Sequence, residues 1–537
     1  MILTIPVLGF TLFLLYRFIL YPVLISPLSR IPTAHWSSPF CPLWLLHLRR
    51  RGSPNATIHA LHQLHGPLLR LAPNEISVNC VDGGIRTVYG GGYEKDDWYA
   101  VFRNYGVSNV FSSSGRAEHS RRKRMMSNVY AKSTVTGSET MRAVARRVLG
   151  ERLMPGLSRS AEMGEEVEMY ALFSGAAMDF VTGYVFGLKC GSDFLRDVDK
   201  CRQWLIEYKA RQDFIFWPQE MPRLTAVARA MGVKHWLVPK WVDQANENIE
   251  AWIMTMCDAA DRLYPSREQL EDGDKAAVYN QLRTMMKKTS GQKVDAALTS
   301  LERLEIASEL LDHVAAGFDT TGITLTYLAW ELSKRENQTL QAALRKELRD
   351  AWSSAHTTKL MTPPSTLDHF KPLDDLPLLN AIIMESLRLH AAIPGIQPRV
   401  TPQDAELGPE GESVNGLPAG VRVTSQAYSL HLNESVFPRA HQWQPRRWLD
   451  SDGNLDLGGE KARWFWAFGS GGRMCIGSNL AMLEMKSLVA TIWAQFTTDI
   501  SDDTGMAHKD GYTSEPLGTD DGSYLRLRFA AVNTKVS

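Results

Sequence analysis

The chain has 537 residues, and its 59 Lys and Arg residues balance 59 Asp and Glu residues, so the formal net charge is zero. This balance gives no electrostatic reason to expect nucleic-acid binding. Six cysteines (41, 80, 190, 201, 257 and 475) lack pairing spacings, which indicates a reducing compartment for the main body. Length alone suggests several domains. No linker or internal repeat divides the chain, however, so we expect one large, mainly helical domain.

The N-terminus is much more apolar than the rest of the chain. Residues 2–25 are interrupted mainly by Arg17, two threonines and two prolines, and they span a bilayer if Arg17 reaches an interface. A cleaved secretory signal is the alternative, but a basic n-region and a small-residue cleavage site are lacking. Arginines follow the stretch and none precedes it, which predicts that the body faces the cytosol. We predict a transmembrane anchor at 1–25 and a Pro-containing hinge at 26–50.

The next part of the chain predicts short strands followed by helices. Runs 68–71 and 75–78 are rich in strand-forming residues and bounded by turn residues. Segment 117–127 is strongly basic and helical in pattern, and segment 165–260 predicts several amphipathic helices. Segment 265–293 is charged and poorly patterned, which predicts an exposed connection.

A long helical pattern covers 301–335, with apolar residues at helical spacing. Its centre, Ala316-Gly-Phe-Asp-Thr-Thr-Gly322, contains two glycines, two β-branched threonines and an aspartate, all of them poor helix formers. A weak centre in a long helix often marks a functional site. A helix kink without function is the alternative.

A second helix begins near Pro377 and carries Glu385 and Arg388 at i and i+3, close enough to pair. A pair at this spacing is usually an exposed salt bridge worth less than about 1 kcal/mol. If the pair is instead buried, removal of one partner costs about 3–5 kcal/mol.

The loop 468–477 reads Phe-Gly-Ser-Gly-Gly-Arg-Met-Cys-Ile-Gly and leads into a helical run over 479–496. Its glycines let the backbone turn tightly and approach a flat group closely. Cys475 precedes a helix N-terminus, where amide donors and the helix dipole favour the thiolate that binds metal. One thiolate is a poor zinc site, because zinc takes four ligands. It suits an iron whose in-plane positions are filled by a porphyrin, and a buried structural cysteine is the alternative.

The loop spacing F-x-x-G-x-R-x-C-x-G resembles the heme-binding loop of the cytochrome P450 superfamily, in which a Cys thiolate holds the heme iron. The matching residues are Phe468, Gly471, Arg473, Cys475 and Gly477.

Two further motifs carry the same resemblance. The string 316–322 matches the family's [A/G]-G-x-[D/E]-T-[T/S], and Glu385-Ser-Leu-Arg388 matches E-x-x-R. Pro445-Arg-Arg447-Trp resembles P-E-R-F, with Arg446 in place of the usual Glu. The resemblance covers residues from about 30 to about 530, and it implies a cytochrome P450 fold, mainly α with small β-sheets, as the heme-thiolate domain at 51–537.

The resemblance implies how a heme b (iron protoporphyrin IX) would be held. Cys475 would ligate the iron, and Arg473 and Arg399 would bind the propionates. His119 and Lys123 have the spacing of another propionate contact, although Lys replaces the family's usual Arg and lacks its fork. The remaining loop residues Phe468, Gly471 and Gly477 would shape the loop around the heme.

The resemblance also assigns the catalytic and structural residues. Thr320 and Asp319 would deliver protons, while Ala316 and Gly317 would leave space for O2. The residues Glu385, Arg388 and Arg447 would form a buried structural triad.

The implied activity is that of a heme-thiolate monooxygenase, which inserts one atom of O2 into a small apolar substrate. The chain has no flavin-binding or Fe–S cysteine pattern, so electrons would come from a separate NADPH-cytochrome P450 reductase. The anchor would be single-pass in the endoplasmic reticulum membrane, as in filamentous-fungal members of specialised metabolism. Two alternatives are an isomerase or dehydratase of the same fold that does not use O2, against which Asp319 and Thr320 argue, and a non-catalytic heme sensor.

Overall fold

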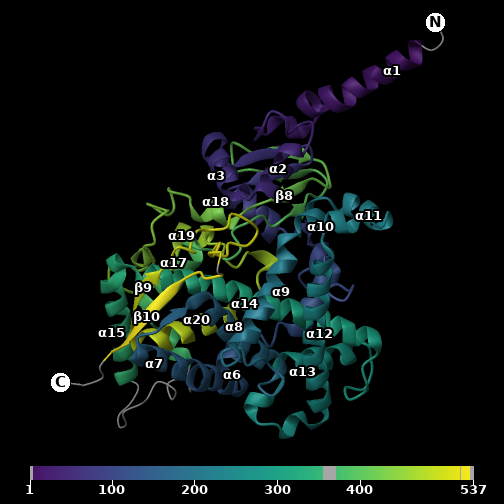
Figure 1. Cartoon of the computed structure of the whole chain (residues 1–537). Helices are drawn as coiled ribbons and strands as arrows, with labels where there is room; N and C mark the ends of the chain where they lie inside the picture. Colours follow the sequence, from purple (N-terminus) through teal and green to yellow (C-terminus); the bar gives the residue numbers. More distant parts are fainter. Residues whose placement is uncertain (1–3, 355–369, 521, 533–537) are drawn as a thin grey trace.

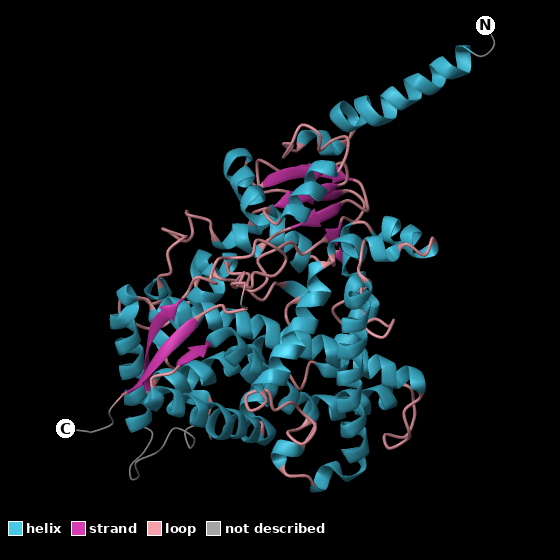
Figure 2. Ribbon diagram, viewed as in Figure 1, coloured by secondary structure: helices cyan, strands magenta, loops and turns pink. Residues whose placement is uncertain are grey.

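The computed structural model describes residues 4–354, 370–520 and 522–532. Most of the body is helical, and strands gather near the N-terminal helix and near the C-terminus (Figures 1 and 2). This is the mainly α architecture with small sheets that the sequence predicts.

The α-helices, in chain order, are α1 (Thr4–Leu15), α2 (Leu43–Arg51), α3 (Pro54–His65), α4 (Arg116–Met126), α5 (Lys132–Gly137), α6 (Glu139–Ala145), α7 (Met154–Met163), α8 (Met169–Phe186), α9 (Val198–Asp213), α10 (Phe216–Glu220), α11 (Pro222–Ala230), α12 (Lys240–Leu263), α13 (Ala277–Thr289), α14 (Ser300–Ser333), α15 (Gln338–Ser354), α16 (Lys371–Asp374), α17 (Pro377–Leu389), α18 (Ala427–His431), α19 (Gly459–Trp464) and α20 (Ser478–Trp493). The strands are β1 (Leu68–Ala72), β2 (Glu75–Val78), β3 (Glu94–Lys95), β4 (Glu166–Glu168), β5 (Arg399–Val400), β6 (Ala405–Leu407), β7 (Val414–Leu417), β8 (Arg422–Thr424), β9 (Phe496–Asp502) and β10 (Arg526–Ala531).

An apolar helical segment projects from the body at the N-terminus (Figure 1). It joins α1 to a π-helical continuation over Tyr16–Ile25. The part Val7–Ile25 is long and apolar enough to cross a membrane, and only 6% of its residues are buried. A helix that is apolar on all sides and not covered by protein is suited to lipid. The predicted N-terminal apolar helix is therefore confirmed.

Three small sheets accompany the helices. The largest has the strand order β1-β2-β8-β5-β3 and lies beside α2 and α3, near the N-terminal helix. The others have the orders β4-β10-β9 and β6-β7. The strands predicted at 68–71 and 75–78 are confirmed as β1 and β2, which pair in antiparallel fashion.

The long helix predicted at 301–335 is confirmed as α14, and α8 packs against it. A capping box begins α14, because Thr299 and Glu302 each bind the other's backbone N–H. The helix stays α-helical through 316–322. A Cβ atom on Gly317 would lie 2.9 Å from the Val181 side chain, and one on Gly322 would lie 2.9 Å from Ser174 Oγ, so both glycines allow α8 to approach closely.

The exposed connection predicted over 265–293 is wrong. This segment contains α13, in which the Lys287 side chain is fully buried. Its Nζ atom lies 2.7 Å from Glu302 Oε2 and also donates to Gln292 and to the Ala297 carbonyl. A lysine is buried only where its charge is paired. Because Lys287 pairs with a residue 15 positions later in the chain, this charged helix can pack inside the protein.

Candidate functional site

A cavity lies between α14, the start of α20 and the segment that joins α17 to β5. It contains about 1460 Å³ of empty space, including its opening to solvent. Both Thr320 of α14 and Cys475, which precedes α20, line this cavity. Two motifs that lie far apart in the sequence therefore border one space.

The loop before α20 holds Cys475 at the cavity wall. The Cys475 backbone N–H donates to the Phe468 carbonyl over 3.0 Å, and Gly477 is the N-cap of α20. Burial raises the pKa of the Cys475 thiol, while backbone N–H groups of Gly477 and Ser478 and the charge of Lys123 oppose this rise. The N–H groups at the start of α20 therefore act on the Cys475 thiol in the direction that favours a thiolate.

Two glycines of the loop have different roles. Gly471 has φ of +70°, and a Cβ atom there would lie 2.1 Å from the Tyr89 carbonyl oxygen. Its lack of a side chain is therefore required by a neighbouring protein segment, and Gly471 does not line the cavity. Gly477 lines the cavity, and a Cβ atom on it would meet nothing within 4 Å. Of these two, Gly477 is the one that leaves room for a flat group.

Three of the predicted propionate contacts line the cavity: Arg473, His119 and Lys123. Arg473 donates to the Ser113 carbonyl over 2.7 Å and also to that of Ser114. Lys123 donates to the Gly472 and Met474 carbonyls over 2.9 and 3.2 Å, so it also holds the Cys475 loop.

Two of the four predicted basic residues, His119 and Arg399, have surroundings that the sequence did not indicate. Burial, followed by the charges of Arg473 and other nearby cations, lowers the pKa of His119 to about 3, so this imidazole is neutral at pH 7. Arg399 lies behind the cavity wall, where it donates to the Tyr99 hydroxyl over 3.0 Å and to the Pro398 carbonyl over 2.8 Å. Of the four predicted basic residues, three line the cavity and Arg399 supports its wall.

The two central polar residues of α14 face different surroundings. Thr320 lines the cavity with Ala316 and Gly317, and its hydroxyl donates to the Ala316 carbonyl over 2.9 Å. Asp319 does not line the cavity. Its carboxylate accepts hydrogen bonds from Tyr208 and Gln212 of α9, each over 3.3 Å.

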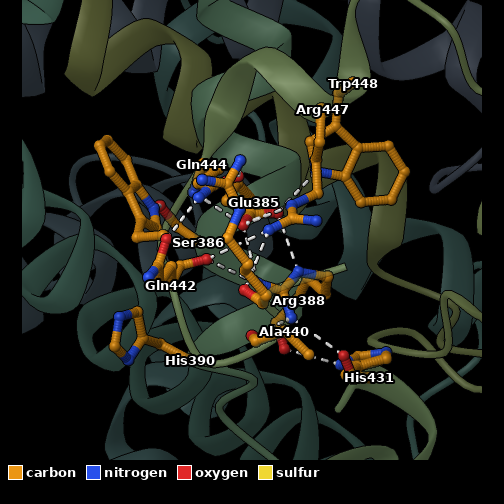
Figure 3. A network of polar contacts seen from close by, with 12 residues as sticks. Glu385, Ser386, Arg388, His390, His431, Ala440, Gln442, Gln444, Arg447 and Trp448 are labelled. Atoms are coloured by element: carbon orange, nitrogen blue, oxygen red, sulfur yellow. Dashed lines mark hydrogen bonds and ion pairs between the residues drawn. The ribbon is translucent and has the colours of Figure 1, made fainter. Parts of the chain in front are cut away.

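The predicted triad residues form a buried network (Figure 3). Glu385 Oε1 lies 2.7 Å from Arg388 Nη2 and 3.0 Å from Arg447 Nε, and the side chains of Glu385 and Arg388 are fully buried. Arg388 also donates to the carbonyls of His431 and Ala440 over 2.9 and 2.8 Å. Every charge in this network therefore has partners, as burial requires.

Trp448 extends the same network, because its Nε1–H donates to Glu385 Oε2 over 2.9 Å. The motif resemblance did not assign a role to this tryptophan. Its position directly after the matched arginine is the signal that could have found it.

The cavity lining also includes ionisable residues that the sequence did not indicate, among them Lys95, Asp312 and Glu484. Burial raises the pKa of Asp312 to about 7 and that of Glu484 well above its usual value. Glu484 is 2% exposed, and its Oε1 atom has no hydrogen-bond partner among the described residues. Asp312 lies two helical turns before Thr320, so helical spacing along α14 was a usable signal for it.

The donor set of the cavity fits a heme. Within the described ranges, no group of three His, Cys, Asp or Glu side chains could hold a metal ion. A single sulfur therefore requires a metal that brings its own in-plane ligands, and the basic residues at the cavity wall suit the carboxylates of such a ligand.

A mainly helical body with Cys475 and several basic residues at the wall of one cavity has the features that a heme-thiolate protein requires. Residues 37–516 match the family model described as Cytochrome P450, and this chain belongs to the cytochrome P450 family. Among curated relatives, cytochrome P450 monooxygenase avaI of Aspergillus versicolor is 28% identical over 78% of this chain and 92% of its own length.

Two further relatives cover nearly the whole chain. Cytochrome P450 monooxygenase orf2 of Aspergillus niger is 25% identical over 95% of this chain and 94% of its own length. Cytochrome P450 monooxygenase hkm5 of Aspergillus hancockii is 26% identical over 91% of this chain and 89% of its own length. The protein is therefore an enzyme of the P450 monooxygenase class, with relatives in filamentous fungi.

Proposed function

We propose that the protein is a membrane-anchored heme-thiolate monooxygenase, which inserts one atom of O2 into a small apolar organic substrate in fungal secondary metabolism. The observation that carries this proposal is the shared cavity of Thr320 and Cys475. Apolar residues such as Val110, Phe111 and Leu387 line the same space, which favours an apolar substrate.

In this proposal Cys475 would hold the iron of a heme b in the cavity. Arg473 and Lys123 line the cavity and would bind the heme propionates. Arg399 would support the cavity wall behind them. The bound heme supplies the activation of O2. The triad of Glu385, Arg388 and Arg447 fixes the chain that precedes the cysteine loop.

In this proposal, residues of the chain itself transfer protons into the cavity. The Thr320 hydroxyl can accept a proton on one side and donate one on the other, directly within the cavity. Asp319 is the residue directly before Thr320 and faces α9. Burial there raises the pKa of Asp319 to about 7. A group with a pKa near the working pH gives and takes protons readily. We propose that Asp319 resupplies protons to the Thr320 side of α14.

The electron donor in this proposal is NADPH-cytochrome P450 reductase, and the location is the endoplasmic reticulum membrane. The N-terminal apolar helix would cross the bilayer once. Arg30 and the run Arg49-Arg50-Arg51 follow the helix, which supports a body on the cytosolic side. An anchor at 1–25, a hinge at 26–50 and a heme domain at 51–537 remain our proposed division of the chain.

The test uses the full chain in microsomes together with the reductase. Candidate substrates come from comparing the metabolites of a fungal strain with and without this protein. We expect a product that requires both NADPH and O2 and that contains one oxygen atom from isotopically labelled O2. A product formed equally well without O2 would favour the isomerase or dehydratase alternative, and heme binding without any product would favour the sensor.

A further inference from the structure

Three basic residues from separate parts of the chain lie close together beside the cavity. Lys95 of β3 pairs through its backbone with Arg399 of β5. The Lys95 backbone N–H donates to the Ser114 carbonyl over 3.3 Å, and the Arg473 guanidinium donates to the same carbonyl. Lys95, Arg399 and Arg473 are therefore held close together by the backbone.

The Lys95 side chain is buried and lines the cavity. It is 7% exposed, and its ammonium lies 4.1 and 4.2 Å from the ring centroids of Tyr99 and Phe111. One hydrogen bond, to the Phe111 carbonyl, uses one of its three N–H donors. In the part of the chain that the structure describes, no carboxylate forms an ion pair with it. The ammonium thus has donors to spare and faces an open space.

The surroundings of Lys95 carry an excess of positive charge. Burial has the largest effect and, together with the charges of Arg399 and Arg473, it holds the pKa of Lys95 well below its usual value. Asp312, which also lines the cavity, opposes this effect without forming an ion pair with Lys95. A buried cation without an anionic partner is strongly unfavourable. Packing alone does not explain a lysine at this position.

We propose that Lys95 is the cation of a carboxylate-binding site in this cavity. An ammonium with free donors in a region of low dielectric binds a carboxylate through a charge-assisted hydrogen bond. The inference rests on the proposed function, because heme b itself brings two propionates. An acidic substrate would bring the same chemical group, so the experiment separates these two sources.

The first part of the test measures heme loss. Purified wild-type protein, Lys95→Met, Lys95→Arg and the matched control Lys288→Met, at an exposed position of α13, are each reconstituted with heme or with heme dimethyl ester. Transfer to apomyoglobin gives the dissociation rate. If the carboxylate is a propionate, we expect Lys95→Met to lose heme about tenfold faster than wild type, with Lys95→Arg between them. With the ester, all four proteins should lose porphyrin at the same rate.

The second part measures substrate charge. The same proteins are titrated with decanoate and with decanol, two probes of equal chain length, and binding is followed by the shift of the Soret band. If the carboxylate belongs to the substrate, we expect Lys95→Met to weaken decanoate binding about tenfold and to leave decanol binding unchanged.

The outcomes show whether Lys95 binds a carboxylate and, if so, whether that carboxylate belongs to heme or to the substrate. Faster heme loss in the first part, or weaker decanoate binding in the second part, supports the site and identifies the source of its carboxylate. Wild-type behaviour of Lys95→Met in both parts would overturn the inference, and so would faster loss of heme and ester alike, because that result indicates a packing defect. If Lys95→Met does not fold, Lys95→Gln replaces it in both parts. A wild-type protein that holds no heme would instead refute the proposed function.

Discussion

The Asp319 carboxylate accepts a hydrogen bond from the Tyr208 hydroxyl of α9 over 3.3 Å, while the next residue of α14, Thr320, lines the cavity. Consecutive residues of an α-helix point about 100° apart, so Thr320 faces the cavity while Asp319 faces α9. Burial raises the pKa of Asp319 to about 7, with a smaller contribution from the charge of Glu515 in the same direction. Lys209 opposes the rise. The carboxyl group therefore gains and loses a proton near neutral pH.

This pKa predicts a pH dependence of the reaction. Because the raised pKa keeps Asp319 protonated below pH about 7, we expect product formation to decline as pH rises through that value. Asp319→Asn should be slow at every pH and should lose this titration. The check is the rate of product formation against pH with reductase in excess.

Asp312→Asn is the matched control, since Asp312 lies on the same helix and its pKa is also raised to about 7. We expect this variant to keep the decline with pH. If Asp319→Asn kept the same decline, the relay assigned to Asp319 would be wrong.

The Thr320 hydroxyl gives a second prediction. Thr320→Ala should fold and bind heme normally, because this side chain lines the cavity and donates only to the Ala316 carbonyl of its own helix. Product formation should fall on the order of 100-fold, with NADPH diverted to hydrogen peroxide, because general acid catalysis is lost. Measurement of peroxide per NADPH consumed checks this. Thr320→Ser restores the hydroxyl and should restore coupling, and unchanged coupling in Thr320→Ala would contradict the assigned role.

The buried network around Glu385 predicts a large effect on stability. Arg388→Leu leaves the Glu385 carboxylate buried without its closest cation, so we expect a loss of about 3–5 kcal/mol in the free energy of unfolding and little bound heme. Urea unfolding and the heme content of the purified protein measure this. Arg446→Leu is the control, because Arg446 is exposed and should tolerate the change. A normal heme content in Arg388→Leu would refute the structural role.

The packing of α14 against α8 predicts a milder effect. Gly322→Ala places a Cβ atom 2.9 Å from Ser174 Oγ and 3.3 Å from Ser174 Cα, so we expect destabilisation of about 1–3 kcal/mol. Gly156→Ala in α7 meets nothing within 4 Å and should be neutral or slightly stabilising. The melting temperatures of the two variants test this, and equal values would show that α8 does not restrict Gly322.

Local motifs made much of the fold and site predictable. The long helix α14, the pairing distance of Glu385 and Arg388, and the position of Cys475 before α20 follow from short-range periodicity and spacing. The function of the weak helix centre was harder to judge. Its glycines 317 and 322 also serve contact with α8, a reason that lies outside the motif.

Other features depend on contacts between distant segments. Lys95 belongs to a two-residue strand whose partner is β5, about 300 positions later in the chain, so no local pattern marks it as part of the cavity. The helix α13 was missed because Lys287 looks like a surface residue until Glu302 is placed beside it. A charged residue can therefore lie in the interior when the fold supplies its partner.

The central claim is that Cys475 binds heme iron as a thiolate inside the cavity that Thr320 lines. The most direct test is the absorption spectrum of the reduced carbon monoxide complex of the purified protein. We predict a thiolate-type Soret band in wild type, and its loss in Cys475→Ser despite an unchanged far-UV circular dichroism spectrum. Purified protein without porphyrin, or a Cys475→Ser variant that keeps the thiolate-type band, would contradict the account.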